Sequence, residues 1–305
     1  MNVSPFNSAD LYETSLLLQI EEVFIEKDWF VTKLIKDTYS FTSTDPLELI
    51  FSGGTALSKA HKKIARFSED VDFRIHSPAP FKRTMLSRWR KSLVQYLHEK
   101  GWSILEDDIV ARDEGRYIAI KIDYPTLYPQ HRALRPRLKL EFRARSIQLP
   151  PTMCEVSSFL NSATKKESEV SEIRCLNLIE NAADKLAALA WRVPARLAQV
   201  KRAEDPNLVR HIYDLASLLP SITDGGIFVS CLEASMKADA EETHKNEQSI
   251  NACAQIKTAL GILQTTPNYR DEYEIFVGDM VYGNVGSCPS FDDGLTAIET
   301  LLRLW

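Results

Sequence analysis

One segment constrains the chain more than any other, and it reads FSGGTALSKAHKKIARFSEDVDFRI, residues 51–75. It begins at the end of a short apolar run, residues 47–51, that stops at two glycines. We therefore expect a buried strand that turns sharply into a helix. Apolar and polar residues then alternate over residues 68–75, which predicts a half-buried second strand.

The two aspartates of this second strand lie on its polar face. Asp70 and Asp72 are two residues apart, so a strand places their Cα atoms about 7 Å apart on one side. Mg²⁺ prefers a few carboxylate oxygens completed by water and substrate phosphates. We expect these residues to bind Mg²⁺, and two such ions suit an in-line displacement at phosphorus. An isolated Asp-x-Asp, however, is more often the solvated face of an ordinary strand.

The glycine turn supplies a second component. Glycines at a helix entrance let backbone N–H groups approach a phosphate closely, and the helix dipole favours negative charge there. We therefore expect Gly53, Gly54 and Thr55 to hold phosphate, although a Gly-Gly pair alone usually marks a tight bend. Lys59 lies off the apolar face of the helix, where it faces either phosphate or solvent.

A third carboxylate would complete a site for two metal ions. In RLKLEFR the alternation places Lys139 and Glu141 on the polar face of a strand, which makes Glu141 the best candidate for a metal ligand or base. Asp123, in KIDY, is the second candidate. The alternative for Glu141 is an ordinary pairing with a charge on a neighbouring strand.

The rest of the chain predicts an α+β fold of two parts. A helix over residues 8–36, a helix over 81–100 and strands over 117–124 and 137–145 complete a mixed-sheet core of at least four strands. From Pro150 onward helical periods dominate. We place a domain boundary at Pro150-Pro151, which gives domains at residues 1–150 and 151–305, the second one resembling a helical bundle.

Charge, cysteine usage and hydropathy narrow the functional classes. The net charge of −5 argues against indiscriminate coating of nucleic acid. Five cysteines without a CxxC pair indicate reduced thiols in a cytoplasmic protein, and no histidine stands near a cysteine at a zinc-binding spacing. Because no stretch reaches about 18 apolar residues, we expect no membrane insertion.

A local basic cluster contrasts with the acidic total. Residues 131–145 hold five arginines and one lysine against a single glutamate. Together with basic residues of the preceding helix, this cluster would follow an RNA backbone. The alternative is a solvated strand edge on which charge prevents aggregation.

Three charged positions stand out in the helical part. Lys185 lies at the centre of an apolar helix stripe, and a buried ammonium needs an anion, either a bound triphosphate or a structural carboxylate. Arg210 and Asp214 are four residues apart and oppose another apolar stripe, so they face a cleft or form a surface ion pair. Asp214 would orient Lys185, Arg210 or the nucleotide.

The assembled pattern resembles the AbiEii family of nucleotidyltransferase toxins, within the DNA polymerase β-like superfamily. The resemblance covers about residues 45–220 and rests on GGTALSK, RFSEDVDF, KLE, ENAADKLAAL and RHIYDL. It implies a nucleotidyltransferase core and a helical domain that completes the nucleotide cleft. It also implies Mg²⁺, a nucleoside triphosphate, a tRNA acceptor and a partner antitoxin.

The predicted site combines these observations. Catalytic roles are predicted for Asp70, Asp72, Glu141, Lys185 and Asp214, of which the first three would bind metal. Nucleotide contacts are predicted for Gly53, Gly54, Thr55, Lys59, Ser68 and Arg210. A phosphate on Ser68 would add negative charge beside the metal ligands and disrupt the site. Two other hypotheses are transfer to a protein acceptor and a non-catalytic binding module of the same fold.

Overall fold

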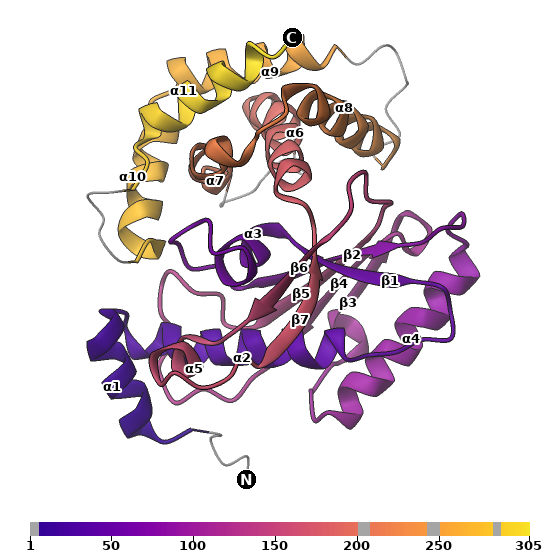
Figure 1. Cartoon of the computed structure of the whole chain (residues 1–305), viewed down its shortest axis with the longest axis vertical. Coiled ribbons are helices and arrows are strands. Elements are labelled where there is room, and N and C mark those ends of the chain that lie inside the picture. The colour runs from indigo at the N-terminus through magenta and orange to yellow at the C-terminus, as the bar shows by residue number, and fades with distance from the viewer. Residues whose placement is uncertain (1–5, 201–207, 243–250, 283–287) are drawn as a thin grey trace. The chain divides into compact units, whose positions relative to one another are not determined.

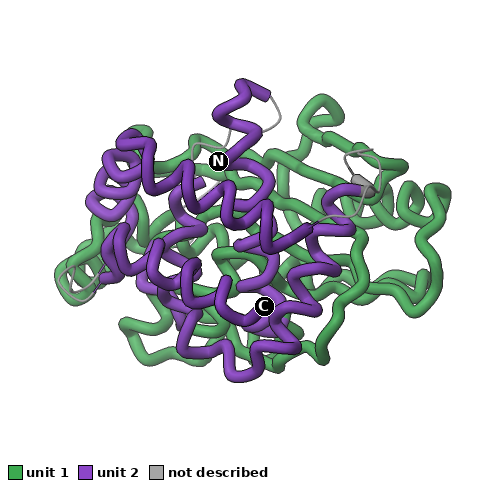
Figure 2. The backbone as a smooth tube through the Cα atoms, turned by 90° about the horizontal axis from the view of Figure 1, so that it is seen from above, with its two compact units in different colours: residues 1–62, 67–176 green, residues 63–66, 177–305 purple. Residues whose placement is uncertain are grey.

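The computed structural model of the chain describes residues 6–200, 208–242, 251–282 and 288–305 (Figure 1). The chain divides into two compact units (Figure 2). Unit 1 comprises residues 1–62 and 67–176, and unit 2 comprises residues 63–66 and 177–305. The short segment 63–66, between the predicted helix and the aspartate strand, thus belongs to the second unit.

Unit 1 is built on a mixed sheet, as the sequence predicts. In the described residues this sheet has seven strands in the order β3-β4-β5-β2-β1-β7-β6. β2 runs parallel to β5 and β1 parallel to β7, whereas the other neighbours are antiparallel. The strands are β1 (Glu48–Ser52), β2 (Asp70–His76), β3 (Ile109–Arg112), β4 (Tyr117–Ile122), β5 (Leu138–Ala144), β6 (Thr152–Val156) and β7 (Val170–Cys175).

Helices accompany the sheet in unit 1 and form the described part of unit 2. Unit 1 contains α1 (Ser8–Leu18), α2 (Glu22–Tyr39), α3 (Gly53–Thr55), α4 (Arg83–Glu99) and α5 (Phe159–Ala163). Unit 2 contains α6 (Leu178–Leu197), α7 (Arg210–Leu218), α8 (Gly225–Glu242), α9 (Ala252–Thr265), α10 (Asn268–Met280) and α11 (Phe291–Leu302). The α+β prediction is therefore confirmed. No helix in the described ranges combines the length and apolar character needed to cross a bilayer.

The alternation of β2 and β5 separates a core face from a polar face. Phe73 of β2 stacks on Phe142 of β5 with 5.9 Å between ring centroids, and Trp89 of α4 meets Phe142 edge-on at 5.1 Å. Burying aromatic rings of this size supplies much of the free energy that holds α4 on the sheet. The opposite face of the same two strands is left for the charged residues.

Two predictions about chain organisation are wrong. The helix expected over residues 8–36 is two helices, because Gln19 adopts a left-handed φ of 56° that ends α1. Strands also continue beyond Pro150, since β6 and β7 join the sheet. β6 lies at the edge of the sheet and buries little of its length, so it lacks the apolar alternation that reveals a strand in a sequence. The two units accordingly divide after Leu176 rather than at Pro150-Pro151.

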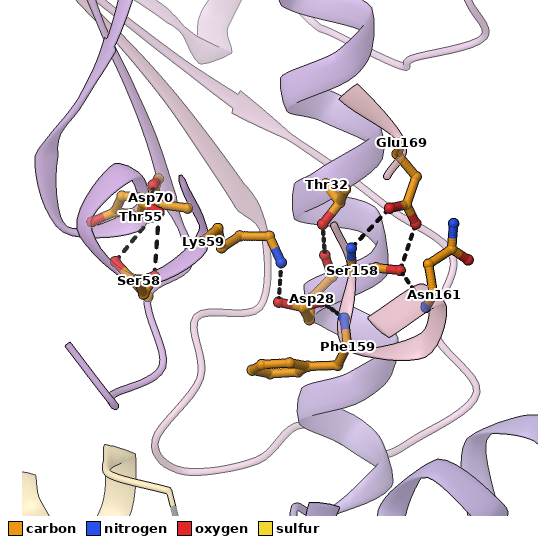
Figure 3. Close-up of polar contacts among 11 residues, drawn as sticks. Asp28, Thr32, Thr55, Ser58, Lys59, Asp70, Ser158, Phe159, Asn161 and Glu169 are labelled. Atoms are coloured by element: carbon orange, nitrogen blue, oxygen red, sulfur yellow. Dashed lines mark hydrogen bonds and ion pairs between the residues drawn. The ribbon is translucent and has the colours of Figure 1, made fainter. Parts of the chain in front are cut away.

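A buried ion pair joins the glycine turn to α2. α3 continues into a π-helical turn, Ala56–Ala60, a geometry that occurs often at functional sites. From this turn Lys59 points to α2, where its Nζ lies 2.5 Å from Asp28 Oδ1 (Figure 3). The other carboxylate oxygen accepts the backbone N–H of Phe159, at the start of α5, at 2.7 Å. Asp28 thus ties three segments of unit 1 together.

We predict that Lys59→Met lowers the free energy of unfolding by about 3 to 5 kcal/mol, because it leaves the Asp28 carboxylate buried without its cation. The matched control is Lys62→Met, since Lys62 pairs with Glu155 at 3.1 Å on the surface. Loss of that exposed pair should cost less than about 1 kcal/mol. Chemical denaturation of both variants measures the difference, and equal losses would contradict the role assigned to Asp28.

Candidate active site

The glycine turn and the aspartate strand meet at one point. The β1–β2 register pairs Ser52 with Asp72, and the next residue, Gly53, has a φ of +73°. A Cβ atom on Gly53 would stand 2.9 Å from Asp72 Cγ, closer than real Cβ contacts. Glycine is therefore required at position 53 for two reasons: the backbone has a positive φ, and the Asp72 carboxylate leaves no room for a Cβ atom. The structure confirms that the Gly53 bend adjoins the Asp70–Asp72 pair.

The third predicted carboxylate joins this group through the register of β2 and β5. In this parallel pair Asp72 stands opposite Glu141, and Asp70 stands opposite Lys139. Neighbouring strands lie about 4.8 Å apart, and paired positions share a face of the sheet. Asp70, Asp72 and Glu141 therefore project from the same face of adjacent strands, as a shared cation site requires.

The surroundings of Asp70 favour a bound cation. Its Oδ1 is buried and accepts no hydrogen bond from the described residues. Arg135 Nη1 lies 3.3 Å away but lacks the alignment of a hydrogen bond. Burial raises the pKa of Asp70, and the positive charges of Arg135 and Lys139 oppose that rise. A buried carboxylate oxygen without a donor is the kind of atom a metal ion would coordinate, so these residues fit Mg²⁺.

The surroundings of Glu141 keep its carboxylate ionised. Lys139 Nζ lies 2.9 Å from its Oε2, and the Tyr117 hydroxyl donates to Oε1. Burial works to raise the pKa of Glu141, but Lys139 and the Tyr117 hydrogen bond outweigh it and lower the pKa. Asp123, the second candidate, instead pairs with Arg137 at 2.7 Å and is 60% exposed.

A network of buried charged residues near Asp70 was not predicted from the sequence. Lys27 of α2 is fully buried, with its Nζ 2.5 Å from Glu69 Oε2. The same Glu69 oxygen accepts the backbone N–H of Arg135 at 2.9 Å, and Lys27 donates to the Arg135 carbonyl. Lys27 and Glu69 thereby fix the segment that brings the Arg135 guanidinium to Asp70. The sequence did not identify Lys27 as a buried residue, because a lysine on the apolar face of a helix normally extends its side chain past its neighbours to water.

At least three of the six cations in the basic cluster of residues 131–145 are paired with carboxylates in unit 1. Arg135 faces Glu69 and Asp70, Arg137 lies 2.6 Å from Asp108, and Lys139 pairs with Glu141. The strand-edge alternative for this cluster is wrong for β5, which lies between β4 and β2 in the sheet.

The other predicted residues of the turn have structural contacts. Thr55 is buried, and its hydroxyl hydrogen-bonds to the Asp70 carbonyl and lies 2.9 Å from Ser68 Oγ. A phosphate contact at Thr55 is therefore left to its backbone N–H. Lys59 is only 8% exposed and meets the Asp28 carboxylate in place of the phosphate or solvent that we expected.

Unit 2 holds a separate buried cluster around Asp214. Lys185 Nζ of α6 lies 2.8 Å from Asp214 Oδ2, and Arg66 makes a two-pronged contact, with Nε 2.7 Å from Oδ1 and Nη2 2.8 Å from Oδ2. All three side chains are at least nine-tenths buried. Of the alternatives for Lys185, the structure shows the carboxylate partner.

Neighbouring cations keep Asp214 ionised. Burial alone would raise the pKa of Asp214, but Arg66 and Lys185 hold that pKa well below its usual range. Together the three groups carry two positive charges and one negative charge. Arg66 was overlooked because it stands in the motif RFSEDVDF beside the aspartates, yet the fold assigns it to unit 2.

Arg210 has a different environment from Asp214, although both lie on α7. Arg210 is half-buried, and its guanidinium carbon lies 5.9 Å from the centre of the Phe276 ring. Asp214 is fully buried, so the alternative of a plain surface ion pair between the two is wrong. A nucleotide contact from Arg210 stays a prediction.

Comparison with known proteins identifies the family and agrees with this fold. The family model "Nucleotidyl transferase AbiEii toxin, Type IV TA system" matches residues 39–297. The chain therefore belongs to the AbiEii family of nucleotidyltransferase toxins. Among solved structures, the fold is similar to MenT4, a nucleotidyltransferase toxin from Mycobacterium tuberculosis, with a TM-score of 0.52, 14% identity and 98% of each chain covered. No curated protein matches the sequence.

We predict that Gly53→Ala destabilises the protein by more than Gly101→Ala does. Both glycines have a positive φ, but no atom lies within 4 Å of a Cβ placed on Gly101. Gly101→Ala thus measures the backbone strain alone, about 1 to 2 kcal/mol. Gly53→Ala adds the displacement of the Asp72 carboxylate. Equal free energies of unfolding for the two variants would show that Asp72 does not press on Gly53.

Asp214→Asn should lower the free energy of unfolding by about 3 kcal/mol or more, because Arg66 and Lys185 lose their buried anion. Glu272→Gln is the matched control, since Glu272 and Arg196 form a pair about one-third exposed, with an expected cost below about 1 kcal/mol. The folded pKa of Asp214 lies below its unfolded value, so its stabilisation is present above about pH 4 and lost as the pH falls further.

Denaturation of wild type and Asp214→Asn between neutral and acid pH checks this prediction. The wild-type protein should lose stability more steeply on acidification than the variant. Parallel acid profiles, or an equal loss in Glu272→Gln, would contradict the ionised state assigned to Asp214.

Proposed function

We propose that this protein uses Mg²⁺ and a nucleoside triphosphate to transfer a nucleotide to RNA, with tRNA as the acceptor. It acts in the cytoplasm as a toxin that a cognate antitoxin protein restrains. The observation that supports this best is the register of Asp72 against Glu141, with Asp70 on the same face and Gly53 against Asp72. Acidic side chains beside a glycine turn suit a metal-bound triphosphate.

Asp70, Asp72 and Glu141 would hold the metal, as one ion or two. A divalent ion in such a site neutralises phosphate oxygens and polarises the phosphorus for attack. Asp70 contributes an oxygen that lacks a hydrogen-bond donor in the described residues, and Glu141 contributes a carboxylate kept ionised by Lys139. Arg135, 3.3 Å from Asp70, adds positive charge on the same side and limits the repulsion among the three acids.

Phosphate binding is proposed for the backbone of Gly53, Gly54 and Thr55, at the start of a helical segment. Lys185 is proposed to supply positive charge to the triphosphate as well. The support is the family resemblance, which assigns a functional lysine to the segment ENAADKLAAL, together with the position of Lys185 Nζ 2.8 Å from Asp214 Oδ2. In this proposal Asp214 orients Lys185, and their contact of 2.8 Å supports this choice among those that the sequence leaves open.

The acceptor and the partner rest on family resemblance together with a few surface residues. Arg83 and Lys91 of α4 are exposed and suit an RNA backbone. The ion pairs of Arg137 and Lys139 leave less of the 131–145 cluster for RNA than its composition suggests.

The test is incubation of the protein with each of four labelled nucleoside triphosphates, Mg²⁺ and total RNA. We predict label transfer to tRNA by wild type and a loss of at least about 100-fold in Asp72→Asn, because removal of a metal-binding charge weakens transition-state stabilisation. Asp123→Asn is the matched control, since Asp123 pairs with Arg137 outside the three-carboxylate group, and it should retain most of the activity.

The outcomes separate the hypotheses. Transfer of label to protein in place of RNA would support the alternative acceptor class. The non-catalytic module would be supported if no nucleotide gives label transfer and if nucleotide binding does not depend on Mg²⁺. Equal transfer by wild type and Asp72→Asn would refute the assigned site.

A further inference from the structure

A second group of metal-binding atoms lies in unit 1, built from residues far apart in the sequence. His61 follows the π-helical turn, Cys154 lies in β6, and Cys175 ends β7. One ligand atom of each lies within 4.8 Å of the other two. The sequence predicts no zinc site because ligand spacings within a short motif are absent, whereas the fold brings together His61 and Cys154 across 93 positions.

Strand pairing creates this cluster. The β6–β7 register sets Cys154 opposite Ile173 and Thr152 opposite Cys175, so the two cysteines are diagonal neighbours on one face. Cys175 in turn pairs with Phe51 of β1, two residues before the glycine turn. The helical segment that starts at Gly53 then leads to His61. The three ligands are therefore positioned by backbone hydrogen bonds.

The imidazole of His61 is oriented as metal-binding histidines usually are. Its Nε2 lies 3.0 Å from the Leu176 carbonyl oxygen. A carbonyl oxygen only accepts hydrogen bonds, so Nε2 carries the proton and the lone pair of the neutral ring lies on Nδ1. Nδ1 lies 3.9 Å from Cys154 Sγ, on the side of the thiols. A backbone carbonyl that fixes the far nitrogen is the common outer contact of a histidine ligand.

We propose that His61 Nδ1, Cys154 Sγ and Cys175 Sγ bind one Zn²⁺ ion, with water as the fourth ligand. One nitrogen and two sulfur donors suit Zn²⁺ in a tetrahedral site, and three protein ligands with a water are an established arrangement. Mg²⁺ requires oxygen donors, so it does not compete here. Burial raises the pKa of both thiols. Binding therefore replaces two thiol protons, which pass to solvent.

The position of the site gives the ion a structural effect. It would join the end of the Gly53–His61 segment to β6 and β7, behind the turn assigned to phosphate. The chain passes from unit 1 into unit 2 after Lys62 and again after Leu176. Lys62 directly follows the ligand His61, and Leu176 directly follows the ligand Cys175. A bound ion would hold these two exits together within unit 1. The inference does not depend on the proposed function.

The test uses the full-length protein, reduced and stripped of metal under anaerobic conditions, with Co²⁺ as a spectroscopic probe. We expect one equivalent of Co²⁺ to give thiolate charge-transfer and tetrahedral ligand-field bands, and Zn²⁺ to abolish both. Cys154→Ser should weaken binding at least about tenfold, and His61→Gln should act in the same direction. Both residues are partly exposed, so these variants tolerate the change better than one at buried Cys175.

Cys253→Ser is the matched control, because Cys253 is a free, partly buried thiol on α9 in unit 2. It should leave the spectra and affinity unchanged. Three outcomes would overturn the proposal: no thiolate band in the reduced protein, an equal band in Cys154→Ser, or failure of Zn²⁺ to displace Co²⁺. The proposal would also be overturned if Cys154 and Cys175 form a disulfide and the protein binds no Co²⁺ once that disulfide has been reduced.

Discussion

The candidate site depends on the parallel pairing of β2 with β5. This register sets Asp72 opposite Glu141, and a shift of one residue would turn one of the two carboxylates into the core. The aromatic stack of Phe73 on Phe142, on the other face, opposes such a shift because it would expose apolar area. The same burial that stabilises unit 1 therefore fixes the spacing of the acids.

Buried charges are the second constraint. Unit 1 encloses the Lys59–Asp28 pair and the Lys27–Glu69 pair, and unit 2 encloses Asp214 with two cations. Such pairs add little net stability compared with apolar residues of similar size, but each is costly to break. They are best understood as devices that fix local geometry. The Lys27–Glu69 pair, for example, holds the segment from which Arg135 reaches Asp70.

Much of the fold and the centre of unit 1's site could be predicted from the sequence, because both follow from local pattern. Alternation predicted that Asp70 and Asp72 lie on the polar face of one strand and Glu141 on the polar face of another, and the glycine pair predicted the bend, whereas the pairing of the two strands comes from the structure. The edge strand β6 was not predicted because too few of its residues are buried to produce an alternation of apolar and polar residues. Lys27, Arg66 and the partner of Lys59 escaped because long-range pairing of buried charges has no local period.

The most direct test of the central claim is anomalous diffraction from crystals of the protein soaked with Mn²⁺ and a non-hydrolysable nucleoside triphosphate. Our account predicts an anomalous peak bounded by the carboxylates of Asp70 and Asp72, with Glu141 on the same side and the phosphates near Gly53. Manganese bound elsewhere, with these carboxylates contacting only protein or water, would contradict it.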